Sequence, residues 1–270
     1  MFKQISIFVL TTFSLTISAT IYLPKDVTIK DIQQAKTQNI QIAWDIHNVL
    51  AQKDGRAKNG AIIRHIFPII GSKIIKNAAW DEVNRLSKIN DISGEAYATI
   101  FLKHKELKLA KMVEETANAY MPRENMEELV RSIHNMGITQ RLASNIGPRF
   151  LANMNTKFKN KHKCHIFDFI MPGKIVDYSK YSGLNPITKT EDHLTSECKP
   201  HPQFYDDFNT TYKKNSQSII IFVDDKIENV QAAVKAGWIG IHFDATKKSK
   251  HAVAQLQNDL ASLGIFNLKK

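Results

Sequence analysis

The feature that most restricts the fold is the apolar run Ser218–Val223, which stops abruptly at the adjacent acids Asp224 and Asp225. A short run this rich in Ile and Val predicts a strand buried on both faces of a parallel sheet. The two carboxylates then emerge at the carboxyl end of the strand, where open α/β sheets bind ligands. Adjacent acids at such a place favour a hard divalent cation with oxygen ligands. The alternative is a helix N-cap, because Asp commonly precedes a first helical turn.

A second apolar run ends in the same way, and this weakens the N-cap interpretation. The pattern of Asn39–Trp44 also predicts a strand, and Asp45 follows it directly. Because the carboxyl ends of neighbouring parallel strands meet at one edge of a sheet, the two acidic strand ends can converge there. We therefore expect Asp45 and Asp225 to share one ion.

Two further landmarks lie between these strands. The short apolar stretch Ile138–Ala143 ends at Ser144 and Asn145, and a Lys-Pro pair begins at Lys199. The order strand–Asp, strand–Ser, Lys–Pro and strand–Asp–Asp resembles the four motifs of the haloacid dehalogenase (HAD) superfamily, over nearly all of residues 38–243. Each motif alone is weak, but four in this order form a fairly specific signal. The resemblance implies an α/β fold with a Rossmann-like parallel sheet as its core.

The resemblance also implies roles for residues that would handle a phosphoryl group. Asp45 matches the aspartate nucleophile, which attacks phosphorus and forms an aspartyl-phosphate intermediate. Ser144 matches the residue that hydrogen-bonds the transferring phosphoryl group, with Asn145 beside it as a further phosphate-binding residue. Lys199 matches the lysine that neutralises negative charge there. Such a set suits phosphoryl transfer, which depends mostly on positioning and charge neutralisation.

The same resemblance implies Mg²⁺ as the cofactor. Asp225 matches the principal ligand, with Asp224 beside it as a second ligand or outer-shell partner, and Asp45 contributes a carboxylate oxygen. The backbone carbonyl of His47 completes the expected ligand set. Asn229 lies one helical turn beyond Asp225 and is expected to orient that carboxylate.

Position 47 departs from the pattern of the phosphatases in this superfamily, which carry a second Asp two residues after the nucleophile. A backbone carbonyl can bind a metal whatever the side chain, but the acid and base role would pass to the imidazole of His47. With an unperturbed pKa of ~6.5, an imidazole can transfer protons near neutrality. His47 is therefore either the general acid and base or a packing or specificity residue, and the residues alone leave both open.

The gap between Asp45 and Ser144 is far longer than one βα unit needs, and its pattern is helical throughout. The expected helices cover residues 61–75, 79–88, 93–120 and 123–136. Residues 36–54 and 125–270 would form the core, and residues 55–124 would form an all-helical cap that resembles the cap of one HAD subgroup. Such a cap excludes water and contributes substrate contacts. The alternative is a helical bundle with no gating role.

The remaining chain continues to alternate between helix and strand patterns. The expected strands cover His165–Ile170 and 238–243, and the expected helices cover 147–155, 202–214, 227–236 and 251–263. The basic run Lys157–Lys163 contains one aromatic residue. We interpret it as a solvated connector in preference to a nucleic-acid patch.

Residues 1–22 are expected to form a signal peptide or a membrane anchor. A short basic start at Lys3 precedes an uncharged, mostly apolar stretch, and Thr16–Ala19 supplies small residues for cleavage. The protein would then be exported, to a periplasm or out of the cell, or anchored in a membrane; an ordinary buried element is the alternative. Export would bring Cys164 and Cys198 into an oxidising space, where they have one possible pairing.

The formal net charge of +11 makes the surface attractive to anions. This charge suits a small phosphorylated substrate, anionic lipid or nucleic acid, but no zinc-finger spacing, RNP signature or Walker loop supports nucleic-acid binding. We predict a Mg²⁺-dependent phosphatase that cleaves a phosphate monoester through Asp45. Two alternatives stay open. One is a binding protein in which His47 has impaired catalysis, and the other is a further HAD reaction such as dehalogenation, against which the Asp224 and Asp225 pair argues.

Overall fold

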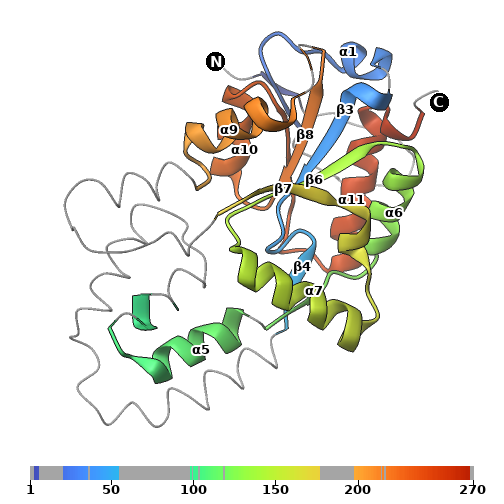
Figure 1. Ribbon diagram of the computed structural model, residues 1–270. Helices are drawn as coiled ribbons and strands as arrows, with labels where there is room; N and C mark the ends of the chain where they lie inside the picture. Colours follow the sequence, from blue (N-terminus) through green and yellow to red (C-terminus); the bar gives the residue numbers. More distant parts are fainter. Residues whose placement is uncertain are drawn as a thin grey trace.

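A seven-stranded, mostly parallel sheet lies at the centre of the computed structural model (Figure 1). The structure describes residues 3–5, 21–54, 98–176 and 198–267, apart from single positions at 36, 99, 103, 118, 214 and 216. Across the sheet the strands follow the order β1 (Lys3–Ile5), β2 (Ile21–Leu23), β9 (Ile239–His242), β8 (Ile219–Asp224), β3 (Ile40–Trp44), β6 (Thr139–Ser144) and β7 (Met171–Ile175). The strands from β9 to β7 are parallel, and β2 and β1 extend the sheet in antiparallel pairing. This architecture confirms the predicted α/β fold with a Rossmann-like core.

The two strands that end in acids are neighbours in the sheet. β3 and β8 pair in parallel, with Trp44 opposite Val223, and every residue of β3 is buried. Because both faces of such strands are covered, only their ends can present polar groups to a ligand. Asp45 N donates a hydrogen bond to Val223 O at 3.0 Å, so Asp45 and Asp224 stand at the same level of the sheet.

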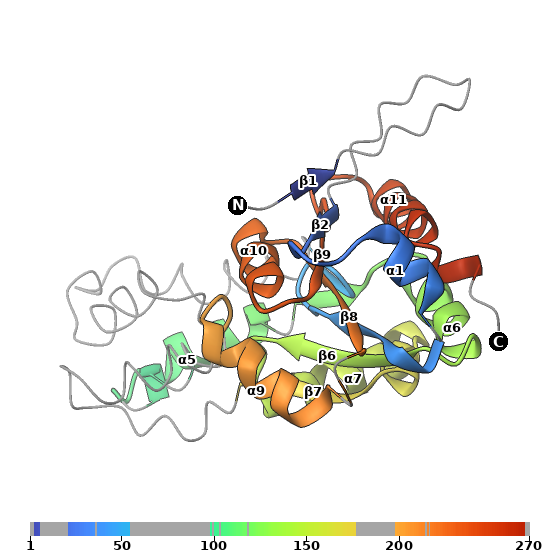
Figure 2. The same ribbon diagram turned by 90° about the horizontal axis from the view of Figure 1, so that it is seen from above.

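Helices cover both faces of the sheet, which explains why its central strands are apolar on both sides (Figure 2). One face is covered by α9 (Pro202–Tyr212) and α10 (Ile227–Lys235). There Tyr205 and Phe208 of α9 pack edge to face against Trp238, which follows α10. The larger apolar core lies on the other face. Its helices are α1 (Ile29–Gln34), α6 (Met126–Asn135), α7 (Pro148–His162) and α11 (Ser249–Ser262).

The prediction of a strand at His165–Ile170 is wrong. These residues form the 3-10 helix η2 (Ile166–Phe169), and the edge strand β7 follows it. β7 approaches β6 so closely that a Cβ added at Gly173 would lie 1.9 Å from Leu142 O. Only glycine fits at such an approach, so Gly173 allows β7 to pair with β6 at this place.

A two-stranded ribbon connects the core to the long insertion between Asp45 and Ser144. Its strands are β4 (Ala51–Lys53) and β5 (Tyr120–Pro122), which pair antiparallel. The helix expected to reach Tyr120 ends earlier, at the end of α5 (Leu107–Ala117), because Tyr120 takes part in this ribbon. The helices expected between residues 61 and 88 lie outside the described residues, so the helical cap stays a prediction.

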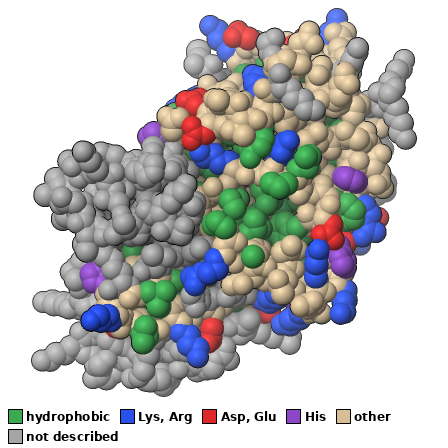
Figure 3. Space-filling model, in the orientation of Figure 1, with side chains coloured by type: hydrophobic (Ala, Val, Ile, Leu, Met, Phe, Trp, Pro, Cys, Tyr) green, Lys and Arg blue, Asp and Glu red, His purple; other side chains and the backbone are tan. Residues whose placement is uncertain are grey.

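The basic run Lys157–Lys163 is the last part of α7 and its cap, and not a connector as expected. Lys157 points inward and donates from Nζ to Tyr120 O at 2.7 Å, so it fastens the ribbon to α7. On the face shown in Figure 3, the Lys and Arg side chains of the described residues are scattered, and hydrophobic side chains gather near the centre.

Cys164 and Cys198 are both free and buried, so they do not form the disulfide that export would allow. The physical reason is their placement in different parts of the interior. Cys164 belongs to the apolar core that contains Phe158 and Ile166, and Cys198 does not. Burial raises the pKa of the Cys164 thiol to about 12, which keeps it protonated near neutrality.

The N-terminal part of the chain contributes to the edge of the sheet where the structure describes it. Ile21 and Leu23 of β2 are buried, and β2 pairs with β9. Residues 6–20, which hold most of the expected signal or anchor, lie outside the described residues. Among the described helices, none has both the length and the hydrophobicity needed to cross a membrane.

Candidate active site

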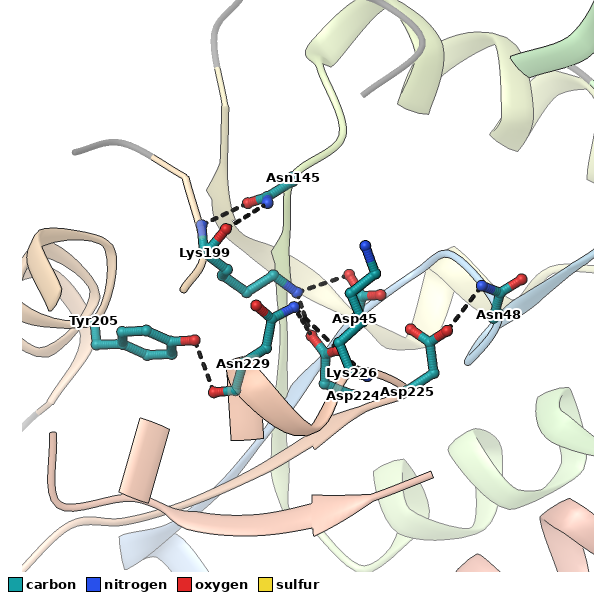
Figure 4. Close-up of polar contacts among 9 residues, drawn as sticks. All are labelled: Asp45, Asn48, Asn145, Lys199, Tyr205, Asp224, Asp225, Lys226 and Asn229. Carbon is teal, nitrogen blue, oxygen red and sulfur yellow. Dashed lines mark hydrogen bonds and ion pairs between the residues drawn. The ribbon is translucent and has the colours of Figure 1, made fainter. Parts of the chain in front are cut away.

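Three carboxylates meet at the carboxyl edge of the central strands (Figure 4). Asp45 follows β3, whereas Asp224 ends β8 and Asp225 follows it. One oxygen from each carboxylate lies within 4.8 Å of the others. This closeness follows from the parallel pairing of β3 with β8, which brings residues far apart in the sequence to one edge of the sheet.

Lys199 lies within this cluster, although only 1% of its side chain is exposed. Its Nζ donates to Asp45 Oδ1 at 2.8 Å and to Asp224 Oδ2 at 2.6 Å. Burial by itself lowers the pKa of a lysine, but the charges of Asp224 and Asp45 outweigh burial and raise the pKa of Lys199 above its usual value. The ammonium is therefore charged, and it offsets the repulsion between the two carboxylates.

Asp224 is fully buried, and several donors besides Lys199 hold its carboxylate. Asn229 Nδ2 donates to Oδ1 at 3.1 Å and to Oδ2 at 3.0 Å, and Lys226 N donates to Oδ1 at 2.8 Å. The expectation that Asn229 orients Asp225 is therefore wrong. Asn229 lies in the first turn of α10 and is itself buried, so it faces the end of β8 and meets Asp224. Tyr205 Oη donates to Asn229 O at 2.8 Å and fixes this turn.

Asp225 points away from Asn229 and toward Asn48 (Figure 4). Asn48 Nδ2 donates to Asp225 Oδ2 at 2.8 Å, and His242 Nε2 lies 3.1 Å from Asp225 O. Asn48 has a φ of +62°, in the left-handed region that Asn adopts more readily than most residues. The sequence patterns did not single out Asn48; its place three residues after Asp45 was the one signal that pointed to it.

The electrostatic state of the cluster favours a bound cation. Burial raises the pKa of Asp224, against the opposing charge of Lys199, and Asp45 raises it further. Burial and the charge of Asp45 also raise the pKa of Asp225, and the hydrogen bond from Asn48 opposes them. Three carboxylates beside one buried ammonium leave a surplus of negative charge, which a divalent cation would neutralise.

The side chain of Asn145 makes two hydrogen bonds with the backbone of Lys199, one as donor and one as acceptor. Its Nδ2 donates to Lys199 O at 3.0 Å, and its Oδ1 accepts from Lys199 N at 2.8 Å. The amide expected to bind phosphate thus fastens the residue that carries the ammonium. Ser144, at the end of β6, is fully buried, and within the described part of the chain its Oγ has no hydrogen-bond partner.

His47 is half-buried and lies where the chain turns from β3 into the ribbon. Its backbone forms an isolated bridge with Ala51, and its imidazole packs on Tyr120 of β5. The two ring centroids are 4.7 Å apart, and the ring planes are tilted by 51°. The imidazole is therefore held by the ribbon, two residues from Asp45.

The donor set fits a hard divalent cation such as Mg²⁺, because carboxylates offer only oxygen ligands. Within the described residues, Asp45, Asp224 and Asp225 are the one group of three or more His, Cys, Asp or Glu residues that could hold a single ion. Asp224 is already engaged by Lys199 and by amide donors, so Asp45 and Asp225 have more ligand capacity left.

No protein-family model and no curated protein matches the sequence. Solved structures do match the fold. A predicted HAD-like family hydrolase from Porphyromonas gingivalis has 14% identity and a TM-score of 0.50, over 80% of this chain and 97% of that one. A HAD family enzyme from Bacteroides thetaiotaomicron has 13% identity and a TM-score of 0.52, over 81% and 99%. An aspartate-to-alanine mutant of that enzyme, in complex with magnesium and inorganic phosphate, has 11% identity and a TM-score of 0.51, over 79% and 98%.

Proposed function

Since the chain has the fold of the HAD-like hydrolases, we propose that it is a Mg²⁺-dependent phosphatase that cleaves a small phosphate monoester. One observation carries the proposal: Asp45, Asp225 and Lys199 converge at one largely buried strand edge. That edge combines a carboxylate nucleophile, a surplus of negative charge for a cation, and an ammonium for the phosphoryl group. These are the parts that phosphoryl transfer requires.

Asp45 acts as the nucleophile in this proposal. A carboxylate oxygen of Asp45 attacks phosphorus, the bond from phosphorus to the leaving-group oxygen breaks, and an aspartyl phosphate forms. The backbone bond from Asp45 N to Val223 O and the contact with Lys199 hold the residue in place for this attack. Water then attacks the phosphorus of the aspartyl phosphate, which releases phosphate and restores the carboxylate.

Lys199 and Ser144 receive the phosphoryl group. The Lys199 ammonium offsets negative charge on the phosphoryl oxygens. The two hydrogen bonds between the Asn145 side chain and the Lys199 backbone keep Lys199 in place for this role. The Ser144 hydroxyl donates a hydrogen bond to a phosphoryl oxygen. Among the described residues, the buried Ser144 Oγ has no hydrogen-bond partner. A buried hydroxyl without a hydrogen bond is unfavourable, so a phosphoryl oxygen that accepts from it would stabilise the site.

His47 moves the proton. It donates a proton to the leaving-group oxygen when the ester bond breaks, and it accepts one from the attacking water in the second half of the reaction. Its packing on Tyr120 restricts the ring to a narrow range of orientations, which suits a residue that must reach one oxygen.

Asp45, Asp225 and the backbone carbonyl of His47 would hold Mg²⁺, while Asp224 stays bonded to Lys199 and Asn229. When bound, the ion supplies positive charge that offsets the charge developing on the phosphoryl group. The Bacteroides thetaiotaomicron enzyme with the same fold was crystallised with magnesium and inorganic phosphate, which supports this assignment. The net charge of +11 also favours an anionic substrate.

Hydrolysis of para-nitrophenyl phosphate, with added Mg²⁺ or with EDTA, tests the proposal. The wild type should turn over only with Mg²⁺, and Asp45→Asn should be slower by about 10³-fold or more with an unchanged melting temperature. Undiminished turnover by Asp45→Asn would refute the assignment of the nucleophile.

The histidine at position 47 favours a second candidate, a protein that binds Mg²⁺ and a phosphorylated ligand without hydrolysing it. This candidate predicts calorimetric Mg²⁺ binding by the wild type with no turnover of any phosphate ester. A dehalogenase would instead release halide from a haloacid without added Mg²⁺. Release of phosphate only with Mg²⁺, or of halide without it, separates the two reactions.

We also propose that residues 1–22 direct export or anchor the protein in a membrane, and that residues 55–124, apart from the strand β5, form a helical cap over the site. β2 begins at Ile21, so cleavage after Ala19 would leave that strand intact but would remove the edge strand β1, which pairs with it. Cell fractionation and N-terminal sequencing of the mature protein test the first part. Hydrogen exchange across residues 55–124 tests the second, with slow exchange expected along each helix.

A further inference from the structure

Arg123 is a buried cation that the proposed mechanism does not use. It directly follows β5 and is 4% exposed. Its Nη2 donates to Asn48 O at 2.7 Å, its Nη1 lies 3.5 Å from Ser249 Oγ, and its Cζ lies 4.9 Å from the centre of the Phe243 ring. Because burying a charge is costly unless partners hold it, these contacts indicate that the guanidinium has a defined task.

Asn48 connects Arg123 to the carboxylate cluster. The carbonyl of Asn48 accepts from Arg123, while its side-chain amide donates to Asp225 Oδ2 at 2.8 Å. The backbone of Asn48 has a φ of +62°, in the left-handed region that Asn tolerates, and its carbonyl is the group that Arg123 binds. The bond from Arg123 restrains this backbone, so the direction of the Asn48 amide depends on the guanidinium.

The guanidinium also lies within the field of Asp225. Burial lowers the pKa of Arg123, and the negative charge of Asp225 opposes this shift. The backbone of Asp225 is held separately, because His242 Nε2 lies 3.1 Å from Asp225 O. With the backbone held by β9, the orientation of the Asp225 carboxylate depends on Asn48.

We propose that Arg123 is a positioning residue that acts through Asn48 to orient the carboxylate of Asp225 for Mg²⁺. The inference rests on the metal site of the proposed function. Arg123 lies where the chain returns from the insertion to the core, so this junction would help to orient the metal ligand Asp225. Partners behind a metal ligand typically change metal affinity by about 10- to 100-fold when they are removed.

Calorimetric titration of the full chain with Mg²⁺ alone, without substrate, tests this role. Arg123→Met and Asn48→Ala should each raise the Kd for Mg²⁺ by about 10-fold. If Arg123 acts through Asn48, the double variant should raise the Kd no further than the larger single effect. Arg131→Met removes an exposed guanidinium from α6 and serves as the matched control, with an unchanged Kd.

Melting in EDTA establishes which variants are folded. If Arg123→Met does not fold, Arg123→Lys carries the test, because it keeps a cation at this position but lacks the guanidinium that binds Asn48 O. Unchanged Mg²⁺ affinity in either folded variant overturns the proposal, and so do fully additive losses in the double variant. A wild type that binds no Mg²⁺ would overturn the metal site itself, which is a distinguishable result.

Discussion

Two parts of the interior hold a buried carboxylate, and they differ in what surrounds it. At the edge of the sheet, Asp224 is 0% exposed and accepts hydrogen bonds from the Lys199 ammonium and from the Asn229 amide. In the last turn of α11, Asp259 is 3% exposed and accepts a hydrogen bond of 3.2 Å from the neutral amide of Gln255. Asp224 thus lies among other charged groups, whereas Asp259 lies in an apolar core.

Burial raises the pKa of both groups, and for Asp259 it does so to about 7. Burial and a raised pKa therefore do not identify a functional acid in this protein. What separates the two places is the buried ammonium and the further carboxylates around Asp224. Asp259 can become neutral by taking up a proton, whereas the sheet edge keeps several charges together, which is useful only where a charged ligand binds.

The largest effect is expected for Lys199→Met, which removes the buried ammonium that distinguishes the sheet edge from the surroundings of Asp259. This change leaves Asp45 and Asp224 buried without their cation, so we expect a loss of about 3–5 kcal/mol in the free energy of unfolding. Turnover of para-nitrophenyl phosphate should also fall by about 10³-fold. Urea denaturation and kcat measure the two effects.

Lys250→Met, at an exposed position of α11, is the control and should match the wild type. Added Mg²⁺ should restore part of the stability lost in Lys199→Met, because it also neutralises the carboxylates. A variant at position 199 that unfolds at the urea midpoint of the wild type would show that the ammonium does not stabilise the cluster.

The acidic strand ends could be predicted from the sequence, because a strand buried on both faces leaves an unbroken Ile and Val run. Ser218–Val223 has this pattern, Asn39–Trp44 has a weaker form of it that Gln41 interrupts, and the two form neighbouring central strands. The edge strand β7 lacked such a run, and its position depends on a close approach at Gly173 that only the folded sheet creates. Local pattern thus predicts the centre of the sheet better than its edge.

Side-chain partners within the site were harder to predict. The hydrogen bonds of Asn48 join it to Arg123, 75 positions away, and to Asp225, 177 positions away. No local pattern encodes such pairs, because they depend on how β5 and β8 pack around one loop. The same reason explains why Asn229 was assigned to Asp225, its nearer acid in helical spacing, although the turn of α10 directs it to Asp224.

The next largest effect is expected at Asp259, the carboxylate in the apolar core. The unfolded chain loses the proton of an Asp near pH ~3.9, whereas folded Asp259 loses it near about 7. The folded state therefore binds more protons between these values, and stability falls as the pH rises through that window. Asp259→Asn removes the titration, so it should stabilise the protein by on the order of 2–4 kcal/mol above pH 7 and by little at pH 4.

Thermal melting of Asp259→Asn and of the wild type across pH 4–8 measures this difference. Asp206→Asn, at an exposed position of α9, is the matched control, because it makes the same replacement at the surface and should add no comparable slope. A gain from Asp259→Asn that is the same at every pH would contradict the protonation argument and point to packing instead.

The smallest effect is expected at the surface pair of Lys159 and Asp168, which tests whether distance or environment decides the value of an ion pair. Their atoms approach to 2.5 Å, as close as those of Lys199 and Asp224, but the side chains are 36% and 43% exposed. The hydrogen bond from Lys159 lowers the pKa of Asp168, so the pair contributes above that pKa and its contribution is lost as the pH falls. Water and salt screen such a pair, and Lys159→Met should change the free energy of unfolding by less than about 0.5 kcal/mol, and by less still at high salt. A loss as large as that of Lys199→Met, measured in the same urea titration, would show that the distance alone stabilises the cluster and that its burial adds nothing.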